Sequence, residues 1–170
     1  MTLKQKHFRE KLNIDIENED EIELNNSNIN YIEDKAFHGA KFLQKINLED
    51  NKIEKLDYNM VNCINCVDCY CLRQLCEINL SQNQIAEIHK HAFYGLISLR
   101  KIWLSFNKIS SINQLTFIKL IWLNELYLNN NQIEKIENAT FNHLKNLQLL
   151  DLSVIKSKKL KRLRFINWNH

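Results

Sequence analysis

The amino-acid sequence predicts an α/β solenoid, in which short coils of chain stack on one another and each coil contributes one strand. Three observations predict this fold. An apolar pattern, LxxLxLxxNxIxxI, occurs in six in-register copies, asparagine occupies one fixed position of most copies, and phenylalanine recurs at the same spacing. A single repeat of this kind cannot bury its apolar face alone, so neighbouring copies must stack to enclose a core.

The fourth position of the pattern gives the spacing of the copies. It falls at Ile22, Ile46, Ile78, Ile102, Leu126 and Leu150. Successive copies are 24 residues apart, except that 32 residues separate Ile46 from Ile78. The aromatic set follows the same spacing and consists of Phe37, Phe93, Phe117, Phe141 and Phe165, with Val61 in the remaining position. The longer step therefore contains eight additional residues, between Val61 and Leu75.

These spacings divide the chain into two parts. We expect residues 1–18 to form an N-terminal capping segment, because a solenoid exposes an apolar end unless something covers it. Alternating residues at 12–16 favour a strand in that segment. We expect residues 19–168 to form a domain of six repeats, with an eight-residue cysteine-rich insertion between residues 62 and 74.

Asparagine is unusually frequent, with 24 residues, whereas proline is absent and glycine occurs twice. After each strand the chain turns inward, and each buried backbone group left unpaired there costs about 1–3 kcal/mol. An asparagine amide both donates and accepts, so one per repeat could bond the turns of stacked coils. The predicted structural ladder consists of Ser27, Asn51, Asn83, Asn107 and Asn131. In the triplet 129–131 only Asn131 would be structural, and Asn129 and Asn130 would lie near solvent.

The six copies and their phenylalanines resemble the leucine-rich repeat family in its 24-residue form, over about residues 19–168. The resemblance implies a curved horseshoe arc with a parallel sheet on the concave face and irregular or short 3₁₀ segments on the convex face. It also implies a non-enzymatic protein-recognition module. The phenylalanine-bearing repeat is similar to that of extracellular members such as Toll-like receptors. The residue usage is similar to that of short insect members, some of them linked to innate immunity.

No catalytic chemistry is visible in the residue pattern. The six histidines are scattered, no glycine-rich phosphate loop is present, and the net charge of +3 is too small to favour nucleic acid as a partner. No apolar run approaches the ~20 residues that cross a bilayer, so we expect no membrane span in this chain. The sequence therefore predicts no enzyme activity, no cofactor and no metal ion.

One cysteine cluster interrupts the repeats and comprises Cys63, Cys66, Cys69, Cys71 and Cys76. Its spacing is too compressed for a zinc site built from two separated cysteine pairs. One or two disulfides are the favoured interpretation, and a bound metal or free thiols are the alternatives. Five cysteines leave at least one unpaired in a monomer, so a disulfide-linked dimer, or one paired through sheet edges, is a further hypothesis.

Two columns of side chains should point outward from the predicted sheet, because successive strand residues alternate between faces. The first reads Glu21, Lys45, Glu77, Lys101, Glu125 and Leu149, and its alternating charges favour ion pairs between neighbouring strands. The second reads Glu23, Asn47, Asn79, Trp103, Tyr127 and Asp151. Exposed aromatic residues in one patch are typical of interface hot spots. The predicted partner-binding residues are Trp103, Tyr127, Phe106, Asp151, Lys101 and Glu125; alternatively, the rings only cover each other.

These observations favour binding of a protein ligand or co-receptor through the concave face, in an extracellular or cell-surface setting. Glycosylation sequons at Asn25, Asn79 and Asn138 agree with that setting, although so many asparagines produce sequons by chance. A cytosolic adaptor is one alternative, since no secretion leader is visible at residues 1–18. A truncated fragment of a larger receptor ectodomain is a second alternative, and a metal protein organised by the cysteines is a third. Trp122, outside the two columns, is expected to pack on the convex side.

Overall fold

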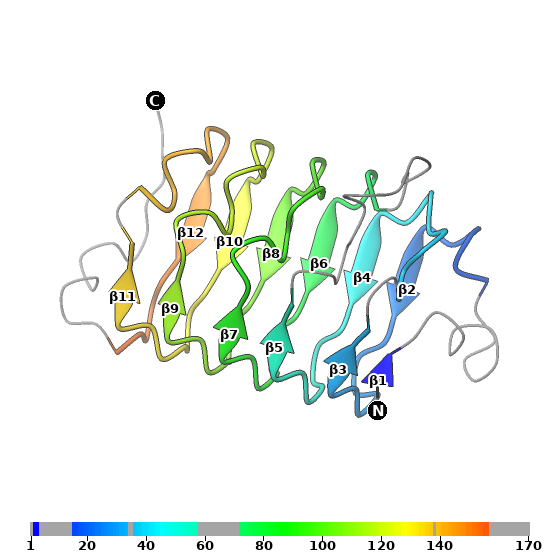
Figure 1. Cartoon of the computed structure of the whole chain (residues 1–170), viewed down its shortest axis with the longest axis horizontal. Helices are drawn as coiled ribbons and strands as arrows, with labels where there is room; N and C mark the ends of the chain where they lie inside the picture. Colours follow the sequence, from blue (N-terminus) through cyan, green and yellow to red (C-terminus); the bar gives the residue numbers. More distant parts are fainter. Residues whose placement is uncertain (1, 4–14, 34–35, 58–71, 138, 157–170) are drawn as a thin grey trace.

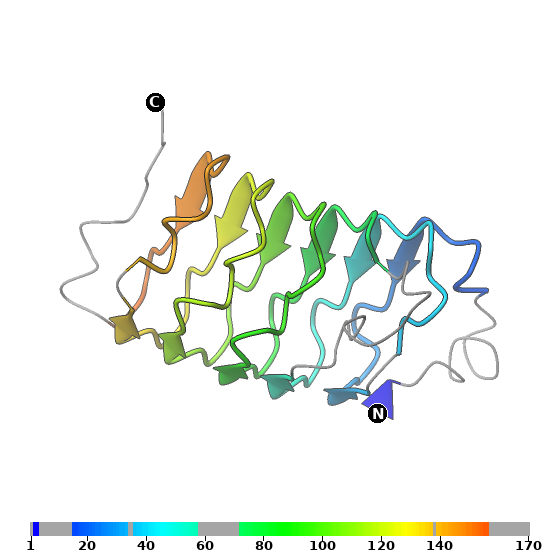
Figure 2. The same ribbon diagram turned by 45° about the horizontal axis from the view of Figure 1, so that its top comes forward.

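The computed structural model describes residues 2–3, 15–33, 36–57, 72–137 and 139–156. Figures 1 and 2 show stacked coils that form a gently curved row, with one long sheet along one side. The sheet is parallel and six-stranded, with the strand order β12-β10-β8-β6-β4-β2. Its strands are β2 (Glu21–Glu23), β4 (Lys45–Asn47), β6 (Glu77–Asn79), β8 (Lys101–Trp103), β10 (Glu125–Tyr127) and β12 (Leu149–Asp151). The predicted solenoid with a parallel sheet on its concave face is confirmed.

Each strand of the long sheet has a buried central residue between two outward residues. The central residues form one continuous column, from Ile22 at one end to Leu150 at the other, and each is at most 2% exposed. Burying one such side chain stabilises the fold by about 1.5–3 kcal/mol relative to leaving it in water. The alternation fixes the register, because a slip of one residue would expose the whole apolar column.

Short two-residue strands line the opposite margin of the solenoid (Figure 1). They pair in parallel as β1 (Thr2–Leu3) with β3 (Tyr31–Ile32), β5 (Lys55–Leu56) with β7 (Glu87–Ile88), and β9 (Ser111–Ile112) with β11 (Lys135–Ile136). The last apolar residue of the repeat pattern lies in five of these strands. Within the described ranges, the return segments contain turns and bends but no helical residues, so they are the irregular form.

The longer step between the second and third repeats leaves the sheet intact. Ile46 and Ile78 are register partners across β4 and β6, although 32 residues separate them. The longer step therefore does not shift the register of the sheet, and most of the predicted insertion lies outside the described residues.

At the N-terminal end, Leu3 and Ile16 are buried against the core. Part of the expected capping strand, residues 12–14, lies outside the described residues, and Ile16 is in a turn. In the described part of residues 1–18, the strand is β1 at Thr2–Leu3, which extends the margin beside β3.

The amide of Asn107 shows how each ladder asparagine joins two coils. Its Nδ2 donates to Leu80 O of the preceding coil at 2.9 Å and to Leu104 O of its own coil at 3.2 Å. Its Oδ1 accepts from the backbone N–H of Ile85 at 2.9 Å. Corresponding bonds surround Asn51, Asn83 and Asn131, and all four side chains are at most 7% exposed. At the first repeat Ser27 donates its backbone N–H to Asn51 Oδ1, and its hydroxyl donates to Asn25 O at 3.2 Å, the carbonyl two residues before it.

The residue just before each ladder position has a left-handed backbone, with φ between 50° and 57° in all six repeats. These corner residues are Asn26, Asp50, Gln82, Phe106, Asn130 and Val154. Asparagine and aspartate tolerate this conformation, whereas other residues with a side chain pay about 1–2 kcal/mol. Asn130 is therefore structural as well as Asn131, because it occupies this corner. Asn129, the third member of the triplet, accepts a hydrogen bond from Ser105 Oγ of the neighbouring coil.

Candidate functional site

We define the sheet face as the outward side chains of the six strands together with the two residues before each ladder position. Trp103 on β8 and Tyr127 on β10 are register partners on neighbouring strands, the third and second strands from the β12 end. Their rings stack with centroids 5.8 Å apart and an interplanar angle of 4°. Both residues are half-buried, so each ring covers part of the other while the rest of the pair faces solvent. The two hypotheses for these rings, mutual cover and an open binding surface, are thus both compatible with their burial.

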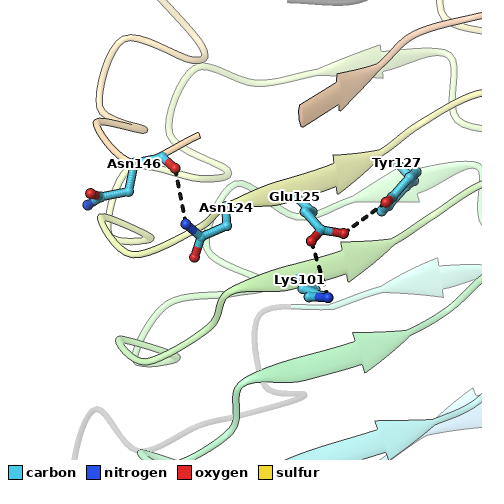
Figure 3. Close-up of polar contacts among 5 residues, drawn as sticks. All are labelled: Lys101, Asn124, Glu125, Tyr127 and Asn146. Atoms are coloured by element: carbon cyan, nitrogen blue, oxygen red, sulfur yellow. Dashed lines mark hydrogen bonds and ion pairs between the residues drawn. The ribbon is translucent and has the colours of Figure 1, made fainter. Parts of the chain in front are cut away.

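Glu125 holds the aromatic pair in place through two polar contacts, which Figure 3 shows. Its Oε1 lies 3.1 Å from Lys101 Nζ, and its Oε2 accepts a hydrogen bond from Tyr127 Oη at 2.8 Å. Glu125 and Tyr127 are two residues apart on one strand, so their side chains leave the same face. At the start of the same strand, Asn124 Nδ2 donates to Asn146 O at 3.3 Å. The ring of Tyr127 is therefore anchored at its hydroxyl before any partner arrives.

The environment of Tyr127 makes its phenol group hard to ionise. Partial burial, the bond to Glu125 and the negative charges of Glu125 and Asp151 raise the pKa of Tyr127 from 10.0 to about 12. The folded protein holds the phenolic proton more tightly than the unfolded chain does. The resulting stabilisation is complete below pH 10 and is lost as the pH rises towards 12.

We therefore expect the free energy of unfolding to fall more steeply between pH 10 and 12 in the unmodified protein than in Tyr127→Phe. Phenylalanine keeps the stacked ring but has no proton to lose. Urea denaturation at a series of pH values measures both slopes, and the absorbance of tyrosinate gives the ionisation directly. Equal slopes would mean that Tyr127 ionises in the folded protein as it does in the unfolded chain.

Phe106 is an exposed aromatic side chain in an unfavourable backbone conformation. It occupies the left-handed corner after β8 with φ 56°, and its side chain is 57% exposed. The small buried part of the ring stabilises the fold too little to offset a backbone strain of about 1–2 kcal/mol, because most of the ring stays in water. Val154 combines the same features at the corner after β12, with φ 54° and 65% exposure. Strain held at exposed positions supports a functional reason for those residues.

The charged ladder forms in part. Lys45 Nζ lies 2.6 Å from Glu21 Oε1, and Lys101 pairs with Glu125 as described above. Glu77 lies between the two lysines in register, yet it forms no ion pair among the described residues. Neighbouring carboxylates accept from amides instead: Glu23 from Asn47 at 2.6 Å, and Glu49 from Asn79 at 3.0 Å.

The other predicted site residues are spread over different places. Cys76 is a half-buried free thiol whose Sγ donates to Gln74 O at 3.2 Å, and the remaining four cysteines lie outside the described residues. Asn25 is exposed, Asn79 is half-buried within β6, and Asn138 is not described. The described ranges hold no group of three or more histidine, cysteine or acidic residues that could bind a metal.

Trp122 differs from its expectation, because its side chain is 55% exposed rather than packed. It lines a shallow hollow of about 390 Å³ at the margin where the strands begin, together with Gln44, Gln74, Cys76, Ser98 and Arg100. The residue precedes the first leucine of its repeat, a position that the apolar pattern leaves unconstrained. Sequence reasoning therefore had no signal for the direction of this side chain.

The fold and the exposed sheet face define a class of protein: a solenoid of stacked repeats with one open, laterally extended surface. The leucine-rich repeat family model matches residues 70–109 and 97–154, which together span half of the chain. The chain belongs to the leucine-rich repeat family, whose domains are generally non-enzymatic and serve protein interaction. No curated protein sequence is significantly similar to it.

Two solved structures illustrate the shared fold. A chain of the Toll–Spatzle complex of Drosophila, described as a hub in development and innate immunity, has a TM-score of 0.72 and 24% identity. The match covers 91% of the present chain and 20% of that chain. The leucine-rich repeat domain of APL1B has a TM-score of 0.70 and 20% identity, over 80% of the present chain and 37% of that chain. The present chain thus spans a minor part of each.

Proposed function

We propose that this protein binds a protein partner through its sheet face, in an extracellular setting. The observation that carries the proposal is the stacked pair Trp103–Tyr127, which stands on the exposed side of the sheet and is anchored by Glu125. Aromatic residues that are rigid before binding lose little conformational entropy when a partner covers them. They are also the residue types most often found at the energetic centre of protein interfaces.

The structure of the Toll–Spatzle complex supports both parts of the proposal. A chain of the same fold occurs in the complex of Toll with Spatzle, and that structure is of the glycosylated form. No helix long and apolar enough to cross a bilayer occurs in the part of the chain that the structure describes. The likeness to a chain of the Toll–Spatzle complex is the reason that we propose a receptor-like or co-receptor-like role, with Lys101, Glu125, Phe106 and Asp151 at the edge of the contact.

The proposal predicts that Trp103→Ala combined with Tyr127→Ala reduces the affinity for a protein ligand by about a hundredfold or more. A library of random twelve-residue peptides, displayed on phage and selected on the immobilised full chain, supplies ligands whose affinities calorimetry can measure. The peptides enriched on the unmodified protein should bind the double variant far more weakly. Thermal unfolding should change little, because neither ring belongs to the buried core.

A second variant separates binding from folding. Phe106→Asn replaces a strained residue at the left-handed corner by one that tolerates this backbone conformation. We therefore expect the free energy of unfolding to rise by about 1 kcal/mol. Affinity for the same peptides should fall about tenfold, because an exposed aromatic contact is removed. Val154→Asn is the matched control for stability, since it makes the same exchange in the same backbone conformation.

Two results would contradict the proposal. Peptides that bind the double variant as well as they bind the unmodified protein would place the binding surface elsewhere. A loss of stability in Phe106→Asn, alongside a gain in Val154→Asn, would mean that the Phe106 ring is a packing residue.

A further inference from the structure

The sheet face carries a charge opposite to that of the whole chain. It holds seven carboxylates and two lysines, a formal charge of −5, although the chain as a whole has a formal net charge of +3. The carboxylates belong to Glu21, Glu23, Glu49, Asp50, Glu77, Glu125 and Asp151, and the lysines are Lys45 and Lys101. A partner that covers this face must therefore offer positive charge, because burying like charges together is unfavourable.

Most of this negative charge is not neutralised within the protein. Only Glu21 and Glu125 form ion pairs, with Lys45 and Lys101 respectively, in the described part of the sheet face. Glu125 is also occupied by the Tyr127 hydroxyl, so both of its oxygens have partners. Asp151 differs, because one of its oxygens, Oδ1, accepts from Ser153 N at 2.8 Å and its other oxygen has no bond to a described residue.

Asp151 lies next to an open aromatic surface. It is the register partner of Tyr127 on β12, on the side of Tyr127 opposite to Trp103. The nearly parallel stack with Trp103 covers one face of the tyrosine ring and leaves the other face towards β12. The aspartate side chain is shorter than the tyrosine side chain, so a ligand side chain that covers the carboxylate would also lie beside the ring. A planar cation can stack on an aromatic face and pair with a carboxylate at the same time.

We propose that the sheet face binds an extended basic segment of a protein, with an arginine or lysine side chain lying on the outer face of Tyr127 and paired with Asp151. This inference rests on the proposed function and specifies the chemistry of its partner. Further basic residues of the segment would lie over Glu77, Glu49 and Glu23, towards β2. Arginine suits the position beside Tyr127 better than lysine, because its planar guanidinium both stacks and donates two hydrogen bonds to one carboxylate.

The same peptide selection tests the inference. Peptides enriched on the unmodified protein, relative to Trp103→Ala with Tyr127→Ala, should contain more arginine and lysine than the starting library. One enriched peptide is then resynthesised with citrulline, a neutral analogue of similar shape, in place of its arginine. Asp151→Asn, which keeps the oxygen that accepts from Ser153, should weaken binding of the arginine peptide about tenfold and leave the citrulline peptide unaffected. Glu54→Gln, an exposed carboxylate outside the sheet face, is the matched control and should change neither.

The outcomes separate this inference from the proposed function. Enriched peptides without an excess of basic residues, or equal affinity for Asp151→Asn and Glu54→Gln, would overturn the inference. If such peptides still lost affinity for the aromatic double variant, protein binding by the sheet face would stand. If no peptide were enriched over the double variant, both would fail. The inference also predicts that the affinity for the peptides decreases when salt is added, and that the decrease is steeper for the unmodified protein than for Asp151→Asn.

Discussion

Asn107→Ala is expected to lower the free energy of unfolding by about 3 kcal/mol. The variant leaves the backbone N–H of Ile85 buried without the acceptor that it has among the described residues, which accounts for about 1–3 kcal/mol. It also removes the donors to Leu80 O and Leu104 O, each a bond of about 1 kcal/mol. Asn107 belongs to the fourth of six coils, so its loss weakens the contact on which both halves of the solenoid depend. Urea denaturation followed by circular dichroism measures the change.

Asn142→Ala is the matched control, because it truncates an exposed asparagine of the return segment. We expect a change within about 0.5 kcal/mol, as for most surface substitutions. A loss below about 1 kcal/mol for Asn107→Ala would contradict the interpretation that the amide supports the turns. Such a small loss would mean that water, or a shift of the backbone, provides the Ile85 N–H with a hydrogen-bond acceptor in place of the Asn107 amide.

The period of the sequence made the core predictable. Once the pattern is in register, Ile102 and Leu126 must face inward and Trp103 and Tyr127 outward, since strand residues alternate. The same alternation places Glu125 on the face of Tyr127, so the bond between them follows from a signal that was present in the sequence. Whether Glu77 pairs with Lys45 or Lys101 could not be predicted from the sequence, because a long side chain can reach several nearly equivalent neighbours.

The left-handed corner is the feature that pattern reasoning missed. Its signal is weak, since only Asn26, Asp50 and Asn130 carry the residue types that favour such a backbone. The residue types of Phe106 and Val154 do not indicate a left-handed backbone, because aromatic and β-branched residues favour an extended chain. The residues that contradict the local preference are also the exposed apolar ones, which is the combination expected where function competes with stability.

The second large effect is expected from the aromatic column inside the return segments. Phe117 is fully buried and stacks between Phe93 and Phe141, with ring centroids 5.8 and 6.3 Å away. Phe117→Ala should lower the free energy of unfolding by about 4 kcal/mol, since it leaves a cavity and breaks two aromatic contacts. The loss is a large part of the about 5–15 kcal/mol that stabilises a typical domain. Denaturation midpoints in urea provide the measurement.

Phe117→Leu keeps the apolar volume closer to native and should cost about 1–2 kcal/mol, so it remains measurable if the alanine variant does not fold. Phe141→Ala gives a graded comparison. Phe141 is half-buried and has one aromatic neighbour among the described residues, so its loss should be about half that of Phe117→Ala. Equal losses at the two positions would show that the column acts as one cooperative unit. Because Phe117 lies in the interior, folded Phe117→Leu should bind the selected peptides with unchanged affinity, in contrast to Trp103→Ala with Tyr127→Ala.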